Sequence, residues 1–210
     1  DLPAGKNLAG AFWQPSAVIC DPDVLQTLPG EYFDDGTAEA LKYGVIADEE
    51  LFGMIASGCT GETLSDIIAR CVAIKAEIVG RDEFDRGERA LLNLGHTIGH
   101  AVEKCSSFTI SHGRGVAIGM AMIARSAEAQ GWCATGTADK ITRALEACRL
   151  PVTSPFAVDE LLKYMINDKK RSGADITLVI PETIGRCALR TVPANALAQL
   201  LTPSKGAAHV

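Results

Sequence analysis

The stretch Arg89-Ala-Leu-Leu-Asn93-Leu-Gly-His96-Thr-Ile-Gly-His100 decides how this chain is interpreted. Its spacing predicts one helix over residues 88–104, in which Arg89, Asn93, His96 and His100 share a stripe at i, i+4, i+7 and i+11. Such a stripe is usually apolar and faces a core. Here it carries a guanidinium, an amide and two imidazoles, which together can hold a metal ion and an anion. We therefore expect the chemistry on this face.

The composition describes a folded, acidic chain. It has 210 residues, 47% of them hydrophobic, with 20 Lys and Arg against 26 Asp and Glu and a net charge of −6. A chain of this length can bury a substantial core. An acidic chain without a basic run argues against nucleic acid as a partner. No apolar run approaches the roughly 20 residues that a membrane span needs, and no signal peptide opens the sequence, so we expect no membrane association.

The cysteines indicate a reducing compartment. Seven are scattered along the chain, an odd number without a C-x-x-C pair, at positions 20, 59, 71, 105, 133, 148 and 187. This usage is typical of buried thiols in a cytoplasmic protein, and not of a disulfide framework or a cysteine zinc site.

The periodicities predict a mainly α-helical fold with two small β elements. Residues 17–21 are expected to form a short strand near the N-terminus, and residues 176–180 and 187–192 a β-hairpin near the C-terminus. Helices are expected from about 37 through 43 and onward, and over 64–79, 88–104, 113–130, 138–148, 158–167 and, briefly, 193–201. Gly115 and Gly119 lie four residues apart and would let a neighbouring helix approach closely. Residues 202–210 are expected to be a flexible tail.

Three histidines are candidate metal ligands. His96 and His100 lie one helical turn apart and could reach the same ion, although the glutamate of an H-E-x-x-H zinc peptidase is missing. His112 precedes the helix expected from residue 113. The alternative for the pair is two core imidazoles, each satisfied by a backbone carbonyl, and for His112 a loop residue without a role.

Several charged residues also allow two interpretations. Glu39 and Lys42 are spaced as a solvent-exposed helix ion pair. Lys75 interrupts an apolar helix and could extend its ammonium from the edge of the core. Asp168-Lys169-Lys170 closes a helix, where cations are favourable. Taken singly, each is better explained as structural.

Together these segments resemble the 3-dehydroquinate synthase family. The matching segments occur in the family's order: Gly5-Lys6-Asn7-Leu-Ala-Gly-Ala-Phe-Trp-Gln-Pro15, Ala38-Glu39-Ala-Leu-Lys42-Tyr43-Gly44, Lys75-Ala-Glu77-Ile-Val, Arg81-Asp-Glu, Arg89 to His100 as quoted above, His112-Gly113 and Asp168-Lys169-Lys170. The resemblance covers residues 1 to about 201, and the Asn-Leu-Gly-His-Thr-x-Gly-His run is its most specific part. It implies the C-terminal metal- and substrate-binding domain over 1–201, with the N-terminal NAD-binding domain absent.

The resemblance implies a lyase of the shikimate pathway to aromatic amino acids. The family converts a seven-carbon keto sugar-acid phosphate (DAHP) into 3-dehydroquinate and phosphate, with bound NAD and a divalent metal, zinc or in some cases cobalt. The steps implied are oxidation by NAD, loss of phosphate, return of the hydride, ring opening and aldol closure. The resemblance also implies a homodimer at full length, and an isolated domain that is inactive without its N-terminal partner.

The resemblance also implies a role for each matching residue. Glu39, His96 and His112 would be the metal ligands, leaving coordination positions open for substrate hydroxyls. Other positions match the substrate and cofactor contacts: Asn93, His100 and Lys169 for the phosphate, Lys75 and Arg89 for the carboxylate and ring hydroxyls, Lys42 as a further active-site lysine, and Lys6, Asn7, Thr27 and Leu28 for NAD.

Two departures and three alternatives remain. Arg114-Gly115 follows His112-Gly113 where the family commonly has Glu-Ala, and Tyr32 stands where a glutamate often precedes the phenylalanine. The alternatives are another sugar phosphate cyclase, a metal-dependent alcohol dehydrogenase of the glycerol dehydrogenase type, and a helical module without activity.

Overall fold

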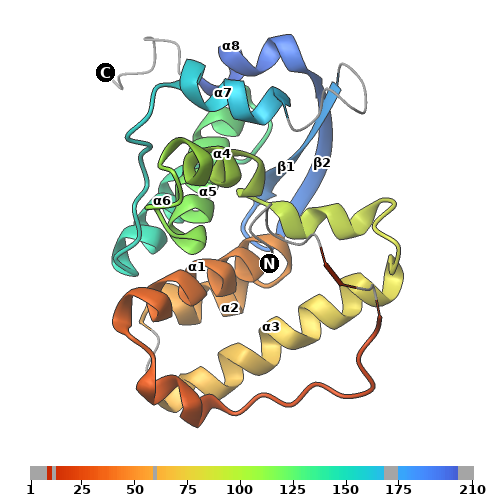
Figure 1. Ribbon diagram of the computed structural model, residues 1–210, viewed down its shortest axis with the longest axis vertical. Helices are drawn as coiled ribbons and strands as arrows, with labels where there is room; N and C mark the ends of the chain where they lie inside the picture. Colours follow the sequence, from red (N-terminus) through yellow and green to blue (C-terminus); the bar gives the residue numbers. More distant parts are fainter. Residues whose placement is uncertain (1–8, 11–12, 59–60, 168–174, 203–210) are drawn as a thin grey trace.

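A computed structural model describes residues 9–10, 13–58, 61–167 and 175–202 of the chain. The described part is mainly helical, as expected, with one antiparallel hairpin packed against the helices (Figure 1). Its helices are α1 (Gly30–Ala47), α2 (Glu49–Ala56), α3 (Gly61–Arg81), α4 (His96–Cys105), α5 (His112–Ala129), α6 (Thr137–Ala147), α7 (Val158–Asn167) and α8 (Leu197–Leu201). Three 3-10 helices accompany them: η1 (Pro22–Thr27), η2 (Glu88–Asn93) and η3 (Ala194–Ala196). None of the described helices combines the length and apolar character needed to cross a membrane.

Helix α5 forms the centre of the fold. It contacts α4, α1, α6 and the strand β1 (Asp175–Thr183), and twelve of its residues are buried. Small side chains allow this: a Cβ added at Gly119 would lie 2.0 Å from the carbonyl oxygen of Gly95, and one at Gly113 would lie 2.4 Å from the backbone of Asp35. The close approach predicted from the spacing of the glycines in this helix is therefore present. It brings the start of α4 against α5, and the start of α5 against α1.

The predicted hairpin is confirmed. β1 pairs with β2 (Arg186–Pro193) in antiparallel register, with Ile176 opposite Val192 and Ile180 opposite Ala188. The turn contains Gly185 at φ +80°, and its N–H donates to the carbonyl of Val45 on α1 over 3.1 Å. The hairpin is thus tied to the helix that carries Glu39.

Two sequence predictions are wrong, and α2 was not foreseen. Residues 17–21 form no strand, because a strand requires a neighbouring strand for its backbone groups and none lies beside them in the described part of the chain. The predicted helix over 88–104 is interrupted: η2 ends at Asn93, Gly95 takes a left-handed φ of +79°, and α4 begins at His96. The tail beyond residue 202 lies outside the described residues.

Candidate metal centre and adjoining cavity

Glu39 and Lys42 project from the same side of α1 and form a buried ion pair. Lys42 Nζ donates to Glu39 Oε2 over 2.7 Å, and Lys42 is only 3% exposed. Burial lowers the pKa of Lys42, although the charge of Glu39 opposes that shift. Burial also disfavours ionisation of Glu39, but the contact with His112 and the charge of Lys42 outweigh it and lower the pKa of Glu39 to about 2. Glu39 is therefore a carboxylate at neutral pH.

The second oxygen of Glu39 faces two imidazole nitrogens. Oε1 is buried and accepts no hydrogen bond of ordinary length from the residues that the structure describes; it lies 3.4 Å from Nε2 of His96 and 3.5 Å from Nε2 of His112. The ligand atoms of the three residues lie within 4.8 Å of one another. Ligands about 2.0–2.1 Å from a tetrahedral zinc ion are separated from each other by about 3.3 Å. A buried carboxylate oxygen at that spacing from two imidazole nitrogens fits a divalent cation.

The turn before α4 fixes the tautomer of His96. Its Nδ1 lies 3.1 Å from the carbonyl oxygen of Leu94, so Nδ1 carries the proton and donates, and Nε2 keeps its lone pair. Burial and the charge of Lys42 lower the pKa of His96 to about 4. His96 is therefore neutral at pH 7, the form that binds a metal. The left-handed Gly95 that interrupts the predicted helix is what presents this ring.

His112 begins α5 and is held by a carboxylate that sequence reasoning missed. Its Nδ1 donates to Oε1 of Glu103 over 2.9 Å, and Glu103 is only 6% exposed. The contact with Glu39 raises the pKa of His112 to about 9, against the effect of burial, and Glu103 adds to the rise. A carboxylate on the far nitrogen commonly orients a metal-binding histidine. The sequence signal that could have identified Glu103 was its position seven residues after His96, which places both residues on the same side of a helix.

Asp35 on α1 fixes the start of α5. Its Oδ1 accepts from Ser111 Oγ over 2.7 Å and from the backbone N–H of Arg114 over 3.1 Å. This was also missed by sequence reasoning. The departure at Arg114 thus contributes a backbone donor here, and its side chain is outside both candidate ligand groups.

A second triplet of potential ligands overlaps the first. His100, Glu103 and His112 also have ligand atoms within 4.8 Å of one another. However, His100 is exposed, and Glu103 already accepts a hydrogen bond from His112. We therefore interpret Glu103 as the orienting partner of His112, and the triplet that includes Glu39 as the better metal site.

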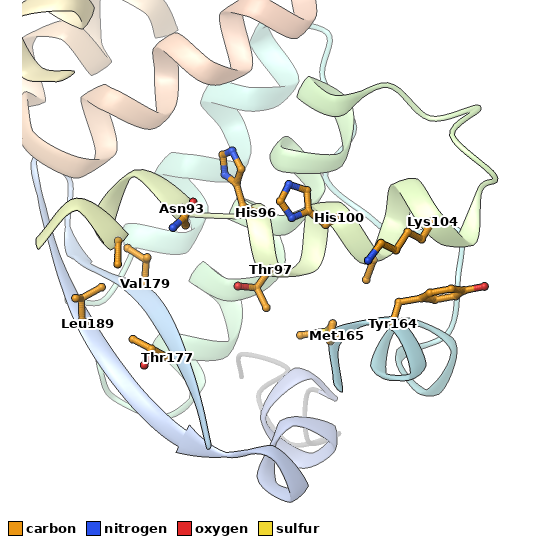
Figure 2. A pocket seen from close by; sticks show the side chains of 12 residues that line it. Asn93, His96, Thr97, His100, Lys104, Tyr164, Met165, Thr177, Val179 and Leu189 are labelled. Carbon is orange, nitrogen blue, oxygen red and sulfur yellow. The ribbon is translucent and has the colours of Figure 1, made fainter. Parts of the chain in front are cut away.

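A cavity of about 290 Å³ adjoins the metal centre, between α4, α7 and the hairpin. His96 and His100 project from α4 on the same side, with ring centroids 5.5 Å apart (Figure 2). Asn93 lines the same cavity from the end of η2. The described lining residues are Ala90, Asn93, His96, Thr97, His100, Ala101, Lys104, Tyr164, Met165, Thr177, Val179 and Leu189. None of them is a carboxylate, so the described wall favours an anion.

The other predicted site residues do not line the cavity or lie outside the described part of the chain. The Arg89 guanidinium donates to the carbonyl of Glu83 over 2.7 Å, and Arg89 does not line the cavity. Because η2 and α4 are separate elements, the single stripe predicted for Arg89 through His100 is wrong. Lys75 is exposed on α3, near enough to Lys42 for its charge to contribute to lowering the pKa of Lys42. Lys6, Asn7 and Lys169 lie outside the described residues.

The predicted cofactor contacts at the end of η1 lie beside an apolar groove. Leu28 lines this groove of about 290 Å³ between η1, α1 and α3, together with Tyr32 and Glu39. Thr27 is exposed, and its Oγ1 donates to the carbonyl of Val24 over 3.1 Å. The groove therefore reaches from Leu28, the one predicted cofactor residue that lines it in the described part of the chain, to Glu39 of the candidate metal centre.

Solved structures show which proteins share this fold. One is a 2-epi-5-epi-valiolone synthase from Streptomyces hygroscopicus subsp. jinggangensis 5008 with NAD+ and Zn2+ bound, at 23% identity and a TM-score of 0.76, covering 86% of this chain and 53% of that one. Another is a 2-deoxy-scyllo-inosose synthase complexed with carbaglucose-6-phosphate, NAD+ and Co2+, at 22% identity and a TM-score of 0.79, covering 96% and 59%. The fold is that of the sugar phosphate cyclases.

Sequence comparison gives the family. Residues 36–171 match the family model described as 3-dehydroquinate synthase C-terminal, and residues 1–35 match the N-terminal one. The chain belongs to the 3-dehydroquinate synthase family, as its motifs predicted.

Curated relatives agree with this assignment. The 3-dehydroquinate synthase of Shewanella sp. (strain MR-4) is 40% identical over 209 residues, 95% of this chain and 58% of the relative. That of Vibrio atlanticus (strain LGP32) is 41% identical over 192 residues, 87% of this chain and 53% of the relative. The chain thus spans somewhat more than half the length of these relatives.

Proposed function

We propose that this chain supplies the metal- and substrate-binding part of a 3-dehydroquinate synthase, which converts DAHP into 3-dehydroquinate and phosphate with NAD and a divalent metal. The observation that carries the proposal is the buried Oε1 of Glu39 facing Nε2 of His96 and Nε2 of His112, beside a cavity without a carboxylate among its described lining residues. The family membership and the relatives at about 40% identity support it.

In this proposal Glu39, His96 and His112 hold the metal, with zinc favoured by a ligand set of one carboxylate and two imidazoles. When bound there, zinc supplies a Lewis acid that lowers the pKa of a coordinated substrate hydroxyl. Lys42 keeps Glu39 ionised through their 2.7 Å contact. Glu103 orients the His112 ring through Nδ1, so that Nε2 points to Glu39. These contacts hold the site in shape before any substrate arrives.

The cavity would receive the substrate phosphate. Asn93 and His100 line it and can donate hydrogen bonds to an anion, and Lys169 is proposed to join them from outside the described residues. Lys75 and Arg89 are proposed for the carboxylate and ring hydroxyls. For that role the Arg89 guanidinium would exchange its bond to the Glu83 carbonyl for the substrate, a bidentate partner that suits arginine better.

NAD supplies a hydride acceptor, and we propose that most of its site lies in the N-terminal part of the family fold beyond the 1–35 segment matched here. Thr27 and Leu28, with Lys6 and Asn7, would complete that site from this chain. The apolar groove that runs from Leu28 to Glu39 supports the proposal, because it leads towards the metal centre. We further propose a cytoplasmic enzyme that is a homodimer at full length.

The test is turnover with and without the rest of the enzyme. Residues 1–210 should bind zinc but release no phosphate from DAHP in the presence of NAD. Addition of the family's N-terminal domain, covalently or in trans, should restore phosphate release and give 3-dehydroquinate. Dehydroquinate formation by the chain alone would refute the proposal that most of the NAD site lies in the N-terminal domain. A different carbocycle as product would favour another sugar phosphate cyclase, and oxidation without phosphate loss would favour an alcohol dehydrogenase.

A further inference from the structure

A lysine that the family resemblance does not assign lines the same cavity. Lys104 lies in the last turn of α4, eight residues after His96 and four after His100. Residues four apart share a side of a helix, so His96, His100 and Lys104 follow one another along the cavity wall. Figure 2 shows this order, with Lys104 above Tyr164 and Met165 of α7. The wall thus carries a metal ligand, an imidazole and an ammonium in succession.

The charge of the cavity makes Lys104 stand out. The chain has 26 Asp and Glu and a net charge of −6, yet none of these carboxylates is among the described residues that line this cavity. Among the same residues, Lys104 is the only lysine or arginine. A cavity whose described lining includes an ammonium and no carboxylate attracts anions.

A purely structural role for Lys104 explains its position less completely than a role in binding an anion. A cation at a helix C-terminus interacts favourably with the partial negative charge of the last carbonyls, and Lys104 is well placed for that. The same partial charge repels an anion entering this end of the cavity. An ammonium between the helix end and the cavity offsets that repulsion. About 6 Å of helix separates Lys104 from His100, a distance that a lysine side chain directed towards the N-terminus can span.

We propose that Lys104 binds the phosphate group of the substrate together with His100, at the end of the cavity away from Glu39. The proposal rests on the proposed function for the identity of the substrate, while its test uses inorganic phosphate alone. Asn93 and His100 can donate hydrogen bonds to the phosphate, and the Lys104 ammonium would add a positive charge that increases the affinity for it.

The experiment measures phosphate binding to the intact 210-residue chain by NMR titration of the histidine ring protons, without metal, NAD or turnover. Lys104→Gln should weaken phosphate binding about fivefold and reduce its dependence on salt, and Lys104→Arg should retain most of the affinity. Lys163→Gln is the matched control: this lysine is exposed on the neighbouring α7 and does not line the cavity. It should change the affinity less than twofold, as expected for an exposed charge outside the site.

Equal losses in Lys104→Gln and Lys163→Gln would overturn the proposal, because they would show only a general charge effect. Absence of phosphate binding, or binding that does not shift His100, would also overturn it. The proposed function can fail separately. If Lys104→Gln weakens phosphate binding but the chain never supports dehydroquinate formation, the anion site is supported and the assigned reaction is refuted. If the enzyme forms dehydroquinate but Lys104→Gln leaves its phosphate affinity unchanged, the assigned reaction is supported and the role of Lys104 in the anion site is refuted.

Discussion

Zinc binding to this chain should depend strongly on pH, because one proposed ligand is protonated at neutral pH. Glu39, with a pKa of about 2, and His96, with a pKa of about 4, are ready to bind at pH 7. His112 is not, since contact with Glu39 raises its pKa to about 9. Zinc must therefore displace the proton on Nε2 of His112, while Nδ1 keeps its bond to Glu103.

The size of the effect follows from that pKa. A group with a pKa of about 9 is deprotonated in about 1% of molecules at pH 7, so proton competition lowers the apparent zinc affinity by up to about 100-fold. The His112 side chain is 45% exposed, and solvent screening reduces the shift. We therefore expect the affinity to rise between about 10-fold and 100-fold from pH 7 to pH 9. The gain should stop once pH exceeds the pKa of His112.

The assay is calorimetric titration of the chain with chelator-buffered zinc, in two buffers of different ionisation enthalpy. The difference between buffers counts released protons, and about one proton per zinc is expected at pH 7. His100→Ala is the control and should release the same number, because His100 is outside the proposed ligand set. A pH-independent affinity from pH 6 to 8, or zinc binding without proton release, would refute the assignment of His112.

Three further outcomes are expected. His96→Ala should lower zinc affinity by more than about 100-fold, whereas His100→Ala should largely retain it; equal losses by chelator competition would mean that the ligands are assigned wrongly. Gly119→Ala should destabilise the chain by about 3 kcal/mol or more in denaturant unfolding, because its Cβ would lie 2.0 Å from a backbone oxygen, whereas Gly53→Ala, with nothing within 4 Å, should stabilise it by about 0.5–1 kcal/mol. A neutral Gly119→Ala would contradict the close packing of α4 on α5. Cys187, whose pKa burial raises to about 12, should resist a thiol reagent at pH 8 until the chain is unfolded, and rapid labelling of the native chain at this position would count against its burial.

Most of the helical framework could be predicted from local pattern. α3, α5, α6 and α7 lie where apolar periodicity predicted them, and the hairpin lies where alternation and a glycine turn predicted it. These features depend on residues within one element. The prediction failed where contacts with other elements decide the structure: the segment 17–21 has a strand pattern, but no strand pairs with it in the described part of the chain.

The candidate site, too, could be predicted from the sequence only in part. The sequence by itself determined the family, through the run from Asn93 to His100, and through that resemblance it named Glu39, His96 and His112. Spacing alone could not bring together residues that are 73 positions apart along the chain. Glycines without side chains let α4 pack closely on α5, and α5 on α1, and this packing brings the three candidate ligand atoms together.

Only the tertiary structure decided how those side chains are oriented. A helix pattern favours a continuous stripe from Arg89 to His100, but the left-handed Gly95 turns the chain, lets the Leu94 carbonyl accept from Nδ1 of His96, and separates Arg89 from the rings. Likewise, Glu103 became visible as a partner of His112 only when two helices met. The physical reason is that hydrophobic periodicity acts within an element, whereas the geometry of a metal site depends on distances between elements.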